Sequence, residues 1–149
     1  MQTHVYEDVT MSQNNLTEFT TFVLRVALGV MYLAHGVVLK FYIFGLAGTA
    51  DFFETIGFPG WIAYVVFTAE LIGGSMLVLG IQARWVALAL LPILFGAVWV
   101  HAGNGWVFSY PNGGWEYPVY LILLSFAQFA LGDGRFALSR SRALPNGIS

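Results

Sequence analysis

The side chain best suited to chemistry in this sequence is Glu70, which lies within an otherwise apolar run from Trp61 to Ile81. A membrane-crossing helix needs about 20 such residues, and a carboxylate near its middle is too costly to persist without a partner or a function. Gly73 and Gly74 follow Glu70 closely, so they share its helix face and permit close approach of another helix. The pattern predicts that Glu70 faces the protein interior.

Further ionisable side chains fall near the membrane boundary at which the Glu70 segment begins. With a rise of about 1.5 Å per residue, the depths below that boundary are roughly 7, 3, 2 and 13 Å for His35, His101, Glu116 and Glu70. The four groups are predicted to line a vestibule toward the membrane midplane, with Glu70 at the end of a proton path. Their vertical spread argues against one metal ion bound by all four, because metal–ligand bonds are only about 2 Å long.

The histidines and Glu116 also have structural interpretations. Either imidazole can hydrogen-bond to a neighbouring carbonyl group or to water at the end of a span. A haem held between His35 and His101 is a weaker alternative, because no haem motif flanks either histidine. Glu116 lies at the start of the last apolar segment, where a carboxylate complements the helix dipole.

For Glu70, the alternative to a functional role is a buried hydrogen bond to Arg25, Tyr32 or a loop amide. A low-dielectric interior disfavours the charged form of its carboxyl group unless Arg25 or another cation reaches it. Arg25 lies about six residues inside the first apolar segment, where a long side chain can snorkel to the membrane interface. These patterns leave the partner of Glu70 open.

The composition is typical of a membrane protein, with 58% apolar and 9% charged residues among 149. A chain of this length has room for one membrane domain with short loops. The net charge is −2 and the basic residues are scattered, which excludes a nucleic-acid interface. Cysteine is absent, so disulfides, Cys-ligated iron–sulfur clusters and thiol redox chemistry by this chain are excluded as well.

Four apolar segments, each of roughly the length needed to cross a bilayer, predict an all-α membrane protein with a four-transmembrane-helix bundle. They are Phe19–Leu39, Trp61–Ile81, Trp85–Ala102 and Trp115–Leu131, of which the last is the shortest. The membrane domain is expected over residues 19–132. Residues 1–18 and 133–149 are expected to be tails, the second of them polar and partly disordered.

The connections between these segments follow from their turn residues. The tight turn from Gly80 to Arg84 predicts an antiparallel hairpin of the second and third helices. The other connections, residues 40–60 and 103–114, are longer and face the opposite side. Pro92 and Gly96 predict a bend in the third helix that opens space near the midplane, opposite Glu70.

A series of short motifs extends along nearly the whole chain. They are Arg25 with Leu28-Gly29, His35-Gly36 and Lys40, Phe52-Phe53 with Gly57 and Pro59, Glu70-Leu71-Ile72-Gly73-Gly74, Leu79-Gly80 and Arg84, His101, Gly113-Gly114-Trp115-Glu116, and Gly132-Asp133-Gly134. In their order and spacing the chain resembles the DoxX family of small integral membrane proteins. This resemblance implies a four-helix inner-membrane protein, often labelled an oxidoreductase and linked through relatives to quinone-reducing thiosulfate oxidation. It also implies membership of oxidant-defence complexes in some bacteria.

The resemblance does not supply a mechanism. No Gly-x-Gly-x-x-Gly motif or cysteine pair is present, so neither nicotinamide nor flavin binding is indicated. If electrons pass through the chain, a bound quinone is the favoured carrier, with Glu70 and His35 as the catalytic groups. The expected cofactor-binding side chains are Tyr32, His35, Glu70, His101 and Glu116.

Two other functions remain open. One is a non-catalytic membrane partner that anchors or stabilises a redox enzyme through its small-residue helix faces. The other, less favoured, is a small-solute or proton-coupled transporter, for which four spans would need to oligomerise. The expected partners are the lipid bilayer, a membrane-associated redox enzyme and further copies of the chain.

The basic residues predict the orientation. With the N-terminus inside, only Lys40 falls at an outer end, and the arginines fall at or near the cytoplasmic ends: Arg25, Arg84, Arg135, Arg140 and Arg142. The positive-inside rule then places both termini in the cytoplasm. The location in the bacterial inner membrane is what the resemblance to the DoxX family implies.

Fusion reporters test this topology directly. Reporters inserted at Gly48 and Asn112 should behave as periplasmic, and one fused after Ser149 as cytoplasmic. Alkaline phosphatase and a fluorescent protein give opposite signals on the two sides. A cytoplasmic signal at Asn112 would overturn the four-span topology.

Overall fold

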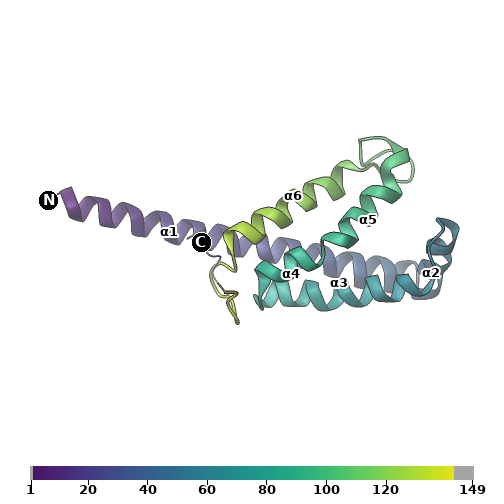
Figure 1. Ribbon diagram of the computed structural model, residues 1–149, viewed down its shortest axis with the longest axis horizontal. Coiled ribbons are helices and arrows are strands. Elements are labelled where there is room, and N and C mark those ends of the chain that lie inside the picture. The colour runs from purple at the N-terminus through teal and green to yellow at the C-terminus, as the bar shows by residue number, and fades with distance from the viewer. Residues whose placement is uncertain (1, 143–149) are drawn as a thin grey trace.

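The computed structural model describes residues 2–142, with side chains from residue 11 onward. Its helices follow one another along this range (Figure 1). They are α1 (Gln2–Leu33), η1 (Ala34–Ile43), α2 (Leu46–Thr55), α3 (Trp61–Leu79), α4 (Ala83–Ala89), α5 (Leu91–His101), η2 (Ala102–Asn104) and α6 (Glu116–Leu131). Residues 143–149 of the expected C-terminal tail lie outside the described part.

Three stretches are long and apolar enough to span a membrane, and α6 is a shorter apolar helix. The three are Met11–Ile43, Trp61–Leu79 and Ala83–Asn104, so the prediction of an all-α four-helix membrane bundle is confirmed. The first expected span has no helix boundary at Phe19, because α1 continues back to Gln2 and projects beyond the other helices (Figure 1).

The first and second spans cross where two glycines face each other. A Cβ atom built on Gly29 of α1 would lie 2.7 Å from the carbonyl oxygen of Gly74 on α3, so the two backbones are in contact there. Gly73 makes room for Leu90 in the same way, at 2.8 Å. Gly73 and Gly74 are both buried, as the sequence predicted for the face they share with Glu70.

The third span bends at Leu90. Pro92 has no amide hydrogen to donate into a preceding helical turn, and it stands near the start of α5, just after α4 has ended. The predicted bend is therefore present. On one side of the bend, α4 packs against α6 near the α3–α4 hairpin. On the other side, α5 runs toward the loop of residues 103–114 (Figure 1).

The α3–α4 turn is the tight hairpin that the sequence predicted. Gly80 has a φ of 71°, which glycine adopts without strain. The chain after α6 covers this turn: the amide of Ser139 donates to the carbonyl oxygen of Gly80 at 3.0 Å, and that of Gln82 donates to Ser139 at 2.9 Å.

Residues 133–142 differ from the expected polar, partly disordered end, because they pack onto the bundle. Asp133 is buried, and its carboxylate accepts hydrogen bonds from the backbone amides of Arg84 and Ser141 and from the Ser141 hydroxyl. The amide of Arg135 also donates to the Glu18 carbonyl oxygen at 2.9 Å. The Asp133 carboxylate thus ties the segment to the start of α4, and the Arg135 amide ties it to α1.

The glycine crossing gives a stability prediction. Gly74→Leu should lower the stability of the purified protein by about 1–3 kcal/mol, because its side chain must displace the backbone of α1 or the Leu33 side chain. Ile72→Leu should change little, because Ile72 is 54% exposed on another face of α3. Thermal unfolding in detergent measures both variants, and equal stability would contradict the crossing.

Candidate functional site

The unusual element near the candidate site is η1, a π-helix that carries both His35 and Lys40. In an α-helix, residues five apart point about 140° away from each other. In a π-helix the backbone hydrogen bonds join residues five apart, so such residues lie nearly one above the other. The π geometry therefore brings His35 and Lys40 toward the same side of the helix.

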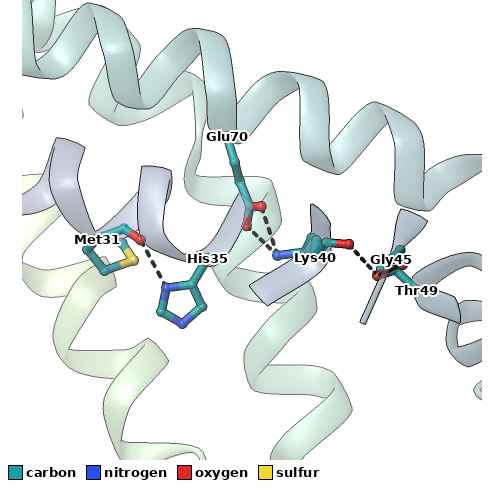
Figure 2. Close-up of polar contacts among 6 residues, drawn as sticks. All are labelled: Met31, His35, Lys40, Gly45, Thr49 and Glu70. Atoms are coloured by element: carbon teal, nitrogen blue, oxygen red, sulfur yellow. Dashed lines mark hydrogen bonds and ion pairs between the residues drawn. The ribbon is translucent and has the colours of Figure 1, made fainter. Parts of the chain in front are cut away.

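Lys40 forms a buried ion pair with Glu70. Its ammonium nitrogen lies 2.8 Å from each carboxylate oxygen, and Figure 2 shows it reaching from η1 to the Glu70 side chain of α3. The exposed fractions of the two side chains are 17% and 4%. Glu70 thus faces the interior as predicted, but its partner is Lys40 rather than Arg25, Tyr32 or a loop amide.

Two small contacts hold this pair in place. Gly36 lies directly against Glu70, and a Cβ atom there would be 3.3 Å from the Cβ atom of Glu70. The Thr49 hydroxyl, at the start of α2, is shared between the carbonyl oxygens of Gly45 at 2.9 Å and Lys40 at 3.3 Å (Figure 2). The second contact anchors α2 beside the base of the Lys40 side chain.

His35 has one ring nitrogen engaged. Nδ1 lies 2.9 Å from the Met31 carbonyl oxygen, which can only accept, so Nδ1 carries the hydrogen. This is the carbonyl contact weighed in the structural interpretation of His35. The ring also stacks on Tyr117 of α6, with centroids 6.0 Å apart. Nε2 is the nitrogen at which this imidazole can gain or lose a proton.

Glu70, Lys40 and His35 all line a cavity of about 510 Å³ between the helices. Its walls are mainly apolar and come from α1, η1, α2, α3, α5 and α6. The aromatic and proline residues among them are Tyr32, Phe52, Phe53, Phe58, Pro92, Phe108, Tyr117 and Pro118. A cavity of this size and character can enclose much of a small organic ligand.

The remaining candidate residues are placed differently. Tyr32 and His101 line the same cavity, and His101 Nδ1 lies 3.3 Å from the Asn104 side-chain amide. The Tyr32 hydroxyl is enclosed near Ser125, without a hydrogen bond of good geometry between them. Glu116 does not line the cavity but lies in the first turn of α6, the position of its structural interpretation.

The position of the Arg25 side chain differs from a second expectation, because it neither pairs with Glu70 nor snorkels to the interface. It is fully buried, and its guanidinium group donates to the carbonyl oxygens of Leu77, Val78 and Arg135 at 2.8–3.0 Å. Carbonyl groups at the C-terminal end of α3 lack helical partners and carry partial negative charge, so a cation is favourable there.

Comparisons with known proteins agree with this arrangement. The family model described as DoxX matches residues 20–103, which is more than half of the chain. The chain belongs to the DoxX family. It is also 35% identical over 123 residues to a Bacillus subtilis (strain 168) protein named "Putative oxidoreductase CatD", covering 83% of this chain and 86% of the relative. The comparison with solved structures finds no match.

The DoxX match contains four candidate residues, Tyr32, His35, Glu70 and His101, together with Lys40. Sequence reasoning missed the role of Lys40, which it treated only as a marker of the outer boundary. The five-residue spacing of His35 and Lys40 carries no signal when an α-helix is assumed. The aromatic residues of α2 were noted in the sequence, but nothing local showed that they line the same cavity as Glu70.

The ion pair predicts non-additive stability effects. Glu70→Gln or Lys40→Met alone should destabilise this DoxX protein, by about 3–5 kcal/mol where the remaining charge stays buried. The double variant should recover most of the loss, because it leaves no uncompensated charge. A double-mutant cycle by thermal or denaturant unfolding in detergent measures the coupling.

An exposed pair serves as the control for this cycle. Arg140 and Glu18 lie 3.1 Å apart with exposed fractions of 65% and 41%, so their coupling should not exceed about 1 kcal/mol. Additive effects at Lys40 and Glu70 would contradict a buried ion pair.

Proposed function

We propose that this DoxX protein is a quinone-linked redox subunit of the bacterial inner membrane, with both termini in the cytoplasm and the quinone ring held in the cavity. The carrying observation is that a largely apolar cavity contains a buried ion pair and an imidazole. The oxidoreductase named among its relatives supports a redox role. The arginine distribution supports the orientation.

The cavity fits the chemistry of a quinone. Its aliphatic and aromatic walls suit a planar ring with an apolar tail, whose carbonyl oxygens need hydrogen-bond donors. Lys40 Nζ has three donor positions, and two of them are used by Glu70. His35 Nε2 offers a further donor when the imidazole is protonated.

A bound quinone would supply reversible redox chemistry, in which electrons and protons are taken up or released together. Within this chain, Lys40, Glu70 and His35 would hold and transfer the protons. Among these three side chains, Glu70 balances the positive charge of Lys40, because removing its negative charge leaves Lys40 uncompensated. The electrons would come from a membrane-associated dehydrogenase, because the chain carries no nicotinamide, flavin or cysteine-based motif of its own. This requirement also supports the second candidate function, a membrane partner of a redox enzyme.

A steric variant tests the binding site. Gly96 lines the cavity, and a Cβ atom there would meet nothing within 4 Å, so Gly96→Leu should fold normally while filling part of the cavity. Quinone extracted from the purified protein and quantified by mass spectrometry should fall several-fold in this variant. Gly48→Leu is the control, because Gly48 also has open space but does not line the cavity. Equal quinone content in both variants would exclude the cavity as the site.

A charge-neutral double variant tests the chemistry. Lys40→Gln with Glu70→Gln leaves no unpaired charge at the position of the ion pair, so it should fold and retain quinone, yet reduce it at least about tenfold more slowly in membranes supplied with an electron donor. Full activity of this variant would show that the pair is structural. Loss of activity without any bound quinone in the wild type would favour the membrane-partner function instead.

A further inference from the structure

Arg25 and Arg84 are both enclosed by the protein, but their guanidinium groups differ in how many of their hydrogen-bond donors have an acceptor. Arg25 donates three hydrogen bonds to backbone carbonyl groups. Arg84, at the start of α4, is only 3% exposed, yet its Nε and Nη1 atoms have no hydrogen-bond partner among the described residues. Its Nη2 atom lies against Gly132, where a Cβ atom would be 2.8 Å away. A buried guanidinium group with unmet donors is costly unless another group accepts from it.

Arg84 lines a small cavity of about 270 Å³ at the end of the bundle opposite the Glu70 site. The cavity is formed where α6 ends and the following segment folds back, and the other lining residues include Gly132, Asp133, Arg140 and Ser141. Glycine backbone beside a guanidinium group allows a ligand to approach closely. The cavity is large enough for a tetrahedral oxyanion and for part of a group attached to it.

The charges around this cavity leave Arg84 without a counter-ion. The Asp133 carboxylate is occupied by the backbone amides of Arg84 and Ser141 and by the Ser141 hydroxyl. Glu18 pairs with Arg140 at the exposed rim, at 3.1 Å. Within residues 11–142, no carboxylate lies within salt-bridge distance of the Arg84 guanidinium group.

We infer that this cavity binds a phosphate group, held by Arg84 at its base and by Arg140 at its rim. Arginine matches phosphate oxygens with paired donors, and a buried guanidinium binds them without competition from bulk water. The cavity lies where the apolar helices end, with Leu131 in its lining and Phe136 and Leu138 exposed on the adjacent segment. This is the depth of phospholipid headgroups, so the phosphate belongs either to an anionic lipid or to a free phosphate ion.

Binding to the full-length protein in neutral detergent tests the inference. Native mass spectrometry and thermal shifts would compare dioleoyl phosphatidylglycerol, dioleoylglycerol, which has the same chains without phosphate, and inorganic phosphate. Phosphatidylglycerol should bind and dioleoylglycerol should not. Stabilisation by millimolar inorganic phosphate alone would identify a free phosphate site. Equal binding of the two lipids, with no effect of inorganic phosphate, would overturn the inference.

Variants separate this site from general charge effects. Arg84→Gln should weaken binding of the phosphate-bearing probe at least about tenfold. If that variant does not fold, two rim variants decide: Arg140→Gln should weaken binding up to about fivefold, and Glu18→Gln should tighten it. Arg142→Gln is the matched control, because Arg142 is an exposed arginine outside the cavity lining. Unchanged affinity in both rim variants would overturn the inference.

Discussion

The ion pair between Lys40 and Glu70 is the interaction on which the cavity-bearing half of this protein depends. Either charge alone would be expensive in a hydrocarbon environment, so the chain must bring η1 and α3 together at one depth. The two distances of 2.8 Å require the small Gly36 against Glu70 and a helix that directs Lys40 back toward the bundle. The π-helical stretch satisfies the second requirement, and it also places His35 beside the pair.

At the opposite end of the bundle, the buried charged side chains bond mainly to backbone groups rather than to each other. Arg25 bridges the end of α3 and the segment after α6 through three carbonyl groups, and Asp133 ties that same segment to α4. The glycine crossing of α1 and α3 lies between these contacts and the cavity near Glu70. The polar chemistry at one end is thus separated from the structural polar contacts at the other.

Much of the fold follows from the sequence because the hydrophobic segments are long and because glycine and proline have strong conformational preferences at the turns. The four spans, the tight turn at Gly80, the bend near Pro92 and the inward-facing Glu70 were all predicted from local patterns. The partner of Glu70 was not, since Lys40 lies 30 residues away and the π geometry changes which residues share a face. The packed segment after α6 was missed because it is tied to the bundle by long-range hydrogen bonds, between Asp133 and the Arg84 amide and between Arg25 and the Arg135 carbonyl oxygen, which no local pattern indicates.

The shape of the cavity explains why its chemistry is concentrated on one wall. The bend at Leu90 turns α5 away from α3, while Phe53 and Phe58 fill the side toward α2, and Phe58 packs edge-on against Trp99 at 5.2 Å (Figure 1). Apart from His101 at the end of α5, these walls bring no side-chain hydrogen-bond donor to the cavity lining, whereas η1 supplies both Lys40 and His35. A planar ligand with carbonyl oxygens would therefore be oriented with one oxygen toward η1 and its apolar part toward α2 and α5. In that orientation, Lys40 and His35 would be the proton donors nearest the oxygen, and Glu70 would compensate the charge of Lys40.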